Sequence, residues 1–191
     1  MKICIVIPVM NKLQFTKQCL EDLNQTIDKT VEIIVIDNAS TDGTNEYIAT
    51  MKQIKLISNC SNKGCASSWN QGIRASRSEW IVILNNDVRL SKNWLDNLIE
   101  QANENSIDVI SPGMREGELD YNFNQYAVSY TEKMKNAFRE CTPSGVCFAV
   151  KNFVFTKAGL FDENFHVGQY EDADFFRRCN KLNFKMGITG R

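Results

Sequence analysis

Carboxylate and amide side chains follow three apolar runs of this 191-residue chain. The first run ends in Pro8–Asn11, another in Asp37 and Asn38, and a third in Asn85–Asp87. Oxygen ligands of this kind suit a hard divalent cation such as Mg²⁺ or Mn²⁺. Asp and Asn also end strands and start turns in proteins of every class. These residues alone therefore leave an ordinary turn and a ligand site as alternatives.

A second acidic group, Glu171, Asp172 and Asp174, lies near the end of the chain, before Arg177 and Arg178. Carboxylates favour the start of a helix, and Asp174 can pair with Arg178 at i, i+4 spacing. That structural interpretation gives Asp172 no role. A carboxylate in a crevice that already holds a metal-binding Asp could instead take a proton from an attacking hydroxyl group.

The elements that must position these residues can be predicted from periodicity. Near-continuous apolar runs separated by helix-length segments predict a parallel sheet covered on both faces. Right-handed crossovers then give an α/β, doubly wound, Rossmann-like fold whose ligands bind beyond the carboxyl ends of the strands. Through residue 111 we predict strands at Ile3–Ile7, Glu32–Ile36, Ile54–Ile57, Trp80–Leu84 and Val109–Ile110, and helices around Phe15–Leu23, Gly64–Ala75 and Leu95–Ala102.

Residues 112–143 break this alternation with glycines, an acidic run and scattered aromatic side chains. They are typical of an irregular insertion, with room for one helix, that covers a site. Regular structure is predicted to return with a strand at Val146–Val150, helices near Asn152–Ala158 and Glu171–Leu182, and a last strand at Lys185–Ile188.

Composition excludes several classes of protein. The balance of 22 Lys+Arg against 23 Asp+Glu argues against a nucleic-acid partner. No apolar run is long enough to cross a membrane, and the start of the chain is too short for a signal peptide, so we expect a cytoplasmic protein, with peripheral contact at the inner membrane face left open. Seven Cys without a C-x-x-C pair, and one His, indicate free thiols rather than a zinc site.

Four segments carry a resemblance to a known family: IVIPVMNKLQFTKQCLEDL, EIIVIDNASTDGT, NKGCASSWNQGI and WIVILNNDV. In this order they resemble the family 2 glycosyltransferases of the GT-A fold. The later strings SGVCFAVKNFVFTKAGLFDENF and YEDADFFRR are similar to the acceptor-side half of that family. Each motif has little specificity by itself, but their order covers nearly the whole chain.

The resemblance implies a single GT-A catalytic domain over residues 1–191, with a nucleotide-sugar-binding half at 1–111 and an acceptor-side half at 112–191. In it, Asp37 hydrogen-bonds the nucleotide base. Asp87 ends a DXD-like motif and binds a divalent metal, manganese or magnesium, that bridges the donor diphosphate. The residues implied to bind the donor are Pro8, Val9, Met10, Asp37, Asn62, Lys63, Gly64, Asn85, Asn86 and Asp87.

The same resemblance makes Asp172 the general base, with Glu171 beside it. The chemistry independently needs such groups, because the departing nucleoside diphosphate gains negative charge and the acceptor alcohol loses a proton. One base and one metal, with no carboxylate placed as a nucleophile, imply direct displacement with inversion. We expect a UDP- or dTDP-linked sugar donor and a saccharide or lipid-linked acceptor in cell-surface polysaccharide synthesis.

Three positions depart from the family pattern. Met10 replaces a common aromatic residue, so it either contacts the base through its thioether or packs in the protein. Trp69 either packs in the core, the interpretation that we favour, or shapes the donor pocket. His166 stands where relatives carry an apolar or aromatic residue, which argues against a metal-ligand role.

Two alternative functions remain beside the transferase. A sugar-phosphate nucleotidyltransferase is disfavoured, since Pro8–Asn11 replaces the Gly-rich basic loop that it needs. A catalytically silent sugar-nucleotide-binding module of a larger protein would bind donor without turnover. The chain stops directly after its last strand, where relatives continue with a His and a closing segment, so we expect a longer protein or a fusion with further domains.

Overall fold

The computed structural model describes residues 1–28, 30–165 and 169–190. Within these ranges one sheet has the strand order β3-β2-β1-β4-β7-β5-β8-β6. Its strands are β1 Ile3–Val9, β2 Glu32–Asp37, β3 Ile54–Ser58, β4 Trp80–Leu84, β5 Val109–Pro112, β6 Phe138–Glu140, β7 Cys147–Lys151 and β8 Met186–Thr189. The helices are α1 Leu13–Thr26, α2 Thr44–Ala49, α3 Gly64–Ala75, α4 Trp94–Glu104, α5 Phe123–Met134, α6 Asn152–Ala158 and α7 Glu171–Lys181.

The sheet is mostly parallel, which confirms the predicted α/β class. Strands β3, β2, β1 and β4 are parallel neighbours, and β8 runs parallel to β5. Strand β7 lies antiparallel between β4 and β5, and β6 pairs antiparallel with β8. The order reverses at β1, so β2 and β4 flank it and all three carboxyl ends reach one edge.

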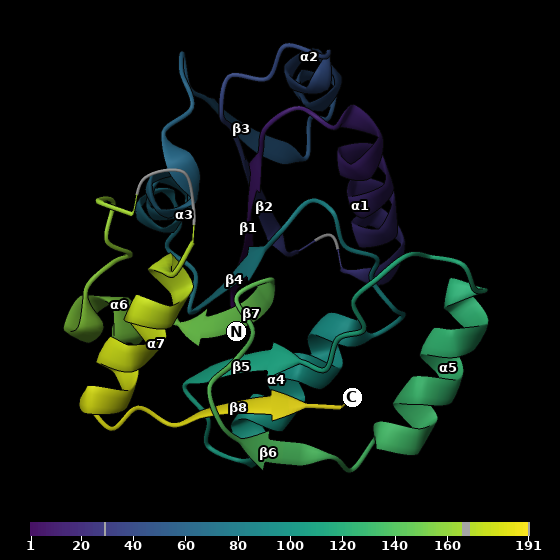
Figure 1. The fold of residues 1–191 in the computed structure, drawn as a ribbon, viewed down its shortest axis with the longest axis vertical. Helices are drawn as coiled ribbons and strands as arrows, with labels where there is room; N and C mark the ends of the chain where they lie inside the picture. The colour runs from purple at the N-terminus through teal and green to yellow at the C-terminus, as the bar shows by residue number, and fades with distance from the viewer. Residues whose placement is uncertain (29, 166–168, 191) are drawn as a thin grey trace.

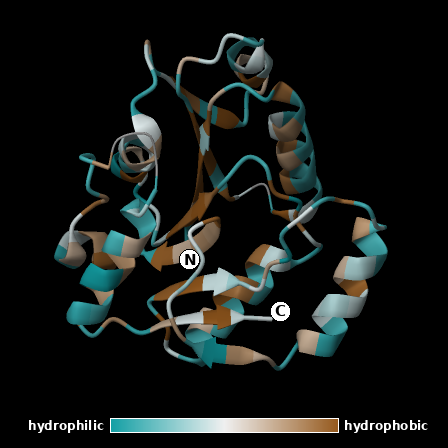
Figure 2. Cartoon of the chain, viewed as in Figure 1, coloured by the Kyte–Doolittle hydropathy of each residue, from teal (hydrophilic) through white to brown (hydrophobic). Residues whose placement is uncertain are grey.

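Helices cover both faces of the sheet (Figure 1). One hydrophobic core lies between the sheet and helices α1, α2 and α4, and the other lies between the sheet and helices α3, α6 and α7. Alternate residues of β1 enter the two cores: Ile5 and Ile7 the first, Cys4 and Val6 the second. The central strands β1, β2 and β4 are accordingly among the most hydrophobic elements of the chain in Figure 2.

Helix α5 and strand β6 are the regular elements of the segment that the sequence describes as an irregular insertion. The predicted single helix is present as α5, whereas β6 was not predicted because its three residues, Phe-Arg-Glu, carry no alternating pattern. None of the residues of α5 is buried. Figure 1 shows the helix beside the far edge of the sheet, after β5.

Trp69 belongs to the core, as favoured from the sequence. Its side chain is 3% exposed, and its ring lies 4.9 Å from that of Phe161 and 6.3 Å from that of Phe148. Cys4, Cys19, Cys147 and Cys179 are also buried among apolar side chains, and burial raises the pKa of the Cys4 and Cys147 thiols to about 12. No helix of the described ranges has the length and apolar character of a transmembrane span.

Candidate active site

Asp37 is the last residue of β2 and lies in register with Val9 of β1 and Ser58 of β3. Its side chain is only 2% exposed. One carboxylate oxygen accepts a hydrogen bond from the Ser40 amide at 3.2 Å, and the other accepts one from the Asn45 side chain at 2.8 Å. Each oxygen keeps a further lone pair, so Asp37 is a rigid acceptor at the edge of the sheet.

A network of side-chain amides joins the end of β2 to the loop before α3. Asn38 Oδ1 accepts from Asn59 Nδ2 at 2.9 Å and from the Lys63 amide at 3.4 Å, and Asn38 Nδ2 donates to the Gly64 carbonyl at 3.3 Å. Gly64 has φ of 81°, a conformation that favours glycine at this turn into the helix. The network holds the loop of residues 59–64 beside the end of β2.

Met10 lies across from this loop at the end of β1. Asn62 Nδ2 is 3.0 Å from Met10 Sδ, and Asn62 Oδ1 accepts from the Gly64 amide at 2.9 Å. Because the Met10 side chain is 47% exposed, it is not an ordinary core residue. The predicted donor-binding residues Pro8–Met10, Asp37 and Asn62–Gly64 therefore surround one edge of the sheet.

The segment Asn85–Asp87 follows β4 and is held to the rest of the protein through its first two residues. The backbone amide of Asn85 donates to the Val146 carbonyl at 3.0 Å, and the side-chain Nδ2 of Asn86 donates to Thr16 Oγ1 of α1 at 2.8 Å. Asp87 is exposed and makes no hydrogen bond or ion pair within the described ranges. It therefore lies open to a ligand at the carboxyl end of β4.

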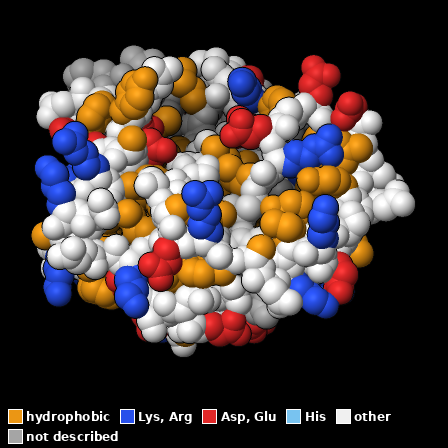
Figure 3. Space-filling view, turned by 60° about the horizontal axis from the view of Figure 1, so that its bottom comes forward, with side chains coloured by type: hydrophobic (Ala, Val, Ile, Leu, Met, Phe, Trp, Pro, Cys, Tyr) orange, Lys and Arg blue, Asp and Glu red, His pale blue; other side chains and the backbone are white. Residues whose placement is uncertain are grey.

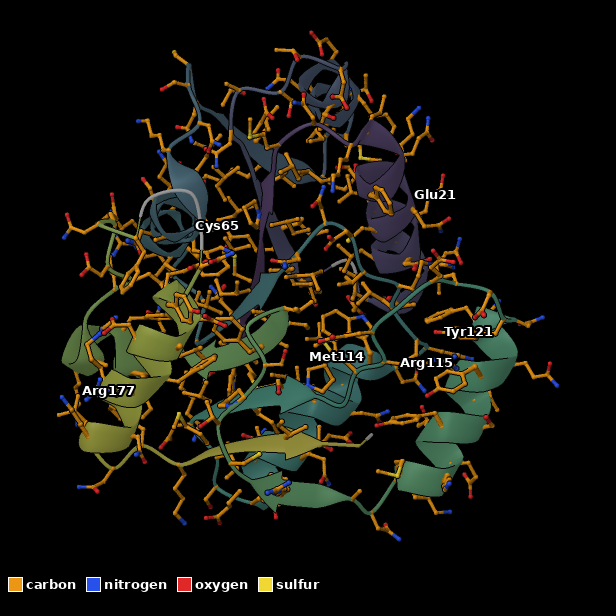
Figure 4. The ribbon with its side chains drawn as sticks, viewed as in Figure 1. Glu21, Cys65, Met114, Arg115, Tyr121 and Arg177 are labelled. Carbon is orange, nitrogen blue, oxygen red and sulfur yellow. The ribbon has the colours of Figure 1, made fainter. Side chains whose placement is uncertain are left out.

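A cavity of about 700 Å³ opens beside Asp87, between α1, α5 and the segment after β5. Tyr121 and Tyr126 lie 4.9 Å apart in it, and the Arg115 guanidinium lies 4.0 Å from the first ring and 4.8 Å from the second. Figure 4 shows Arg115 beside Tyr121 at the start of α5. Other lining residues are Phe15, Arg89, Met114, Phe123, Tyr130, Val146 and Cys147.

Glu171 and Asp172 begin α7 but have different surroundings. Glu171 is 6% exposed and accepts from the Gln169 amide at 2.7 Å. Burial raises the pKa of the Cys65 thiol on α3, and the negative charge of Glu171 adds to that effect. Asp172 is half-buried, and its Oδ1 accepts from the Ala173 amide at 2.7 Å.

Segment 145–147, which leads into β7, connects Asp172 with Asp87. Gly145 lies directly against the Asp172 carboxylate, since a Cβ built on this glycine would be 1.8 Å from Asp172 Oδ2. Val146 and Cys147 line the same cavity as Asp87. The segment therefore contacts the predicted base Asp172 at Gly145 and lines the cavity of the predicted metal ligand Asp87 with its next two residues. The sequence gives no hint of the role of Gly145, because a single glycine in a loop carries no periodic signal.

Charge is evenly mixed on the face shown in Figure 3, where Lys and Arg side chains alternate with Asp and Glu over the surface.

Among the residues that the structure describes, no three His, Cys, Asp or Glu side chains come together as a metal site. His166 lies outside the described residues. A metal at Asp87 would thus have fewer than three such side chains from the described residues.

Comparison with known proteins decides the family. The sequence pattern of glycosyl transferase family 2 matches residues 4–163 of the chain. The chain belongs to glycosyl transferase family 2. The match extends through the donor motifs, the Asn85–Asp87 segment and strand β7, and it confirms the resemblance found in the sequence.

Relatives and structural neighbours of this family 2 chain agree with the fold. The poly(ribitol-phosphate) beta-glucosyltransferase of Bacillus spizizenii is 30% identical over 99% of the chain, which spans 31% of that protein. Residues 1–349 of TarS from S. aureus, in complex with UDP, superimpose with a TM-score of 0.80 at 18% identity, over 100% of the chain and 58% of the TarS chain. Mannosyltransferase PcManGT from Pyrobaculum calidifontis, in complex with GDP-Man and Mn²⁺, superimposes with a TM-score of 0.71 at 19% identity. The match covers 99% of the chain and 56% of the PcManGT chain. The chain thus spans between about a third and three fifths of these proteins and has the expected GT-A fold.

Proposed function

We propose that the protein transfers a sugar, with inversion at the anomeric carbon, from a nucleoside diphosphate donor to a saccharide or lipid-linked acceptor. The observation that carries this proposal is the placement of Asp87 and Asp172 beside segment 145–147. One carboxylate is open to a metal-bound diphosphate, and the other lies against Gly145 of that segment. The glucosyltransferase name of the Bacillus relative supports a role in cell-surface polymer synthesis.

The donor base would bind at the edge formed by β1, β2 and the loop before α3. Asp37 is buried and rigid, so it would accept a hydrogen bond from an imide N–H of uracil or thymine. Pro8 and Met10 would line the base, with the half-exposed Met10 thioether against its face, whereas the predicted Val9 side chain is buried in the hydrophobic core. Asn62, Lys63 and Gly64 would cover the nucleotide, and the Lys63 ammonium would favour a phosphate.

A divalent metal fits Asp87. Magnesium and manganese in phosphate sites are held by one or two carboxylates together with substrate phosphates, rather than by a cage of protein ligands. A single open carboxylate, without a larger acidic cluster in the described ranges, matches that pattern. The bound Mn²⁺ of PcManGT supports the same proposal. Such an ion would neutralise the charge that grows on the departing diphosphate.

Asp172 would serve as the base. It takes the proton from the acceptor hydroxyl while the acceptor oxygen forms a bond to the anomeric carbon, and the bond to the diphosphate oxygen breaks on the opposite face. A base of this kind contributes about 100- to 10,000-fold to the rate. Glu171 faces the loop before α7 through the Gln169 amide, so we assign it to holding the start of that helix.

The aromatic cavity beside Asp87 would receive the acceptor. Tyr121 and Tyr126 present rings, and Arg115 presents hydrogen-bond donors, to an opening that also contains Asp87. Aromatic rings and a planar donor group suit the apolar faces and hydroxyl groups of a sugar ring. A lipid-linked acceptor would place the reaction at a membrane surface.

A ligand screen tests this function against the silent binding module. UDP, dTDP and GDP, each with and without manganese, are compared by thermal shift, followed by UDP-glucose and dTDP-rhamnose as donors. Ligand at 100 times its dissociation constant should add about 2.7 kcal/mol to the free energy of unfolding. We expect a metal-dependent shift with UDP or dTDP, and release of the diphosphate from the matching donor. Binding without any release would favour the silent module, and the absence of binding would overturn both.

A further inference from the structure

Gly145 lies directly against the Asp172 carboxylate, with no room between them for a side chain. A Cβ on Gly145 would lie 1.8 Å from Asp172 Oδ2, 2.6 Å from its Cγ and 3.0 Å from its Cβ. Atoms at these distances overlap, so the carboxylate fills the volume that a side chain at position 145 would need. Gly145 is not among the glycines with a positive φ, so the backbone itself does not call for glycine here. Asp172 does.

We propose that Gly145 is a positioning residue that seats the Asp172 carboxylate, an inference that rests on the proposed function of Asp172 as the base. The other restraint on this side chain is the hydrogen bond from the Ala173 amide to Oδ1. That bond leaves the carboxylate free to rotate about it. Contact with the bare α-carbon of Gly145 fixes Oδ2 and so selects one orientation.

The contact between Gly145 and Asp172, called the seat below, also aligns the base with the rest of the site. The carbonyl of Val146, the residue after Gly145, accepts a hydrogen bond from the backbone amide of Asn85 at 3.0 Å. Both Val146 and Cys147 line the cavity that contains Asp87. A base must come within about 2.6–3.2 Å of the oxygen whose proton it takes. A displacement of about 1 Å can cost roughly 100-fold in rate. A methyl group at position 145 would turn the carboxylate away from this segment.

A stability cycle tests the contact without any ligand. Thermal unfolding is measured for the unsubstituted protein, Gly145→Ala, Asp172→Ala and the double variant, with Ser144→Ala as the neighbouring control. We expect Gly145→Ala to lower the Tm by several degrees, and to lower it much less when Asp172 is already Ala, because only the Cβ–Cβ contact of 3.0 Å then remains. If Gly145→Ala fails to fold, recovery of folding in the double variant supports the seat. Equal losses in both backgrounds, or failure of both variants to fold, overturn it.

A rate cycle with the same variants tests the role in catalysis. The readouts are diphosphate release from UDP-glucose and dTDP-rhamnose, and the affinity for UDP and dTDP with manganese. We expect Gly145→Ala to lower turnover at least 10-fold with nucleotide affinity unchanged, and to cause no further loss in the Asp172→Ala background. Full turnover in Gly145→Ala beside an inactive Asp172→Ala overturns the seat and leaves the proposed function intact. Full turnover in Asp172→Ala removes the base from the proposed function instead, whatever the stability cycle shows.

Discussion

Asp87 and Asp172 differ in how tightly the protein holds them. Asp87 is exposed and makes no hydrogen bond within the described ranges, as suits a ligand that completes its shell with a metal. Asp172 is half-buried, bonded to the Ala173 amide and pressed against Gly145, as suits a group that must meet one hydroxyl in one orientation. Each residue therefore has a substitution with a selective effect.

Asp87→Ala should abolish the effect of manganese on UDP or dTDP binding, because Asp87 is the carboxylate of its motif. The stability of the protein without ligand should change by less than about 0.5 kcal/mol, since an exposed side chain without partners is removed. Thermal shift with and without manganese measures both effects. A variant that still gains affinity from the metal would show that the metal binds elsewhere.

Asp172→Asn keeps the shape of the side chain and cannot accept the proton. Nucleotide affinity should survive, while turnover of the donor falls by about 100-fold or more. Glu171→Gln is the matched control, because its side chain faces the Gln169 amide and Cys65 rather than Gly145. Loss of turnover in Glu171→Gln, with full activity in Asp172→Asn, would move the base to Glu171.

One face of helix α1 contacts the turn that carries Asp87 and holds it in place. Thr16 accepts from Asn86, Cys19 Sγ lies 3.8 Å from the Asn85 carbonyl oxygen, and Asp22 is on the next turn of the same face. Asp22 is 6% exposed and accepts from Arg89 Nε at 2.7 Å and from the Leu90 amide at 3.1 Å. The helix thus positions the turn that carries Asp87.

Asp22→Ala should lower the free energy of unfolding by about 2–3 kcal/mol, because a charged group and a buried amide lose their shared partner. It should also weaken manganese-dependent nucleotide binding, since the turn before Arg89 is no longer anchored. Glu21→Ala is the control on the same helix, at a solvent-facing position (Figure 4). Urea unfolding and thermal shift with UDP measure the two effects. An Asp22→Ala protein as stable as Glu21→Ala would contradict the anchoring role.

Besides the pairing of β4 and β5 with β7 and β8, a buried side chain links helix α3 to the loop after α6. Asn70 of α3 is 1% exposed, donates to the Phe161 carbonyl at 2.9 Å and accepts from the Phe161 amide at 3.0 Å. Its amide also donates to Glu163 at 2.8 Å. Arg178 of α7 meanwhile binds carbonyl groups at the end of α6, including that of Leu160 at 2.9 Å. The loop that leads towards Asp172 is therefore fixed at its beginning to helix α3.

Asn70→Ala should lower the free energy of unfolding by about 2–4 kcal/mol, because two backbone groups lose buried partners. Arg74→Ala is the control on the same helix, as its pair with Glu163 is exposed and contributes about 1 kcal/mol at most. The Asn70 bond lowers the pKa of Glu163 below its ordinary 4.5, so this part of the stability is present at neutral pH and is lost as the pH falls through the lowered value. Urea unfolding at neutral and acid pH measures the effect. The difference in the free energy of unfolding between the unsubstituted protein and Asn70→Ala should be smaller in acid.

The sequence by itself determined the parallel half of the sheet and the residues at its edge. A short apolar run such as Trp80–Leu84 favours a buried strand, and parallel strands bring their carboxyl ends to one side, so Asp37 and Asp87 were expected at the same edge of the sheet. The tertiary structure alone decided the antiparallel entry of β7, the strand β6 and the contact of Gly145 with Asp172. Those features depend on which distant segments pack together, and neither periodicity nor residue type encodes a contact made by a glycine without a side chain.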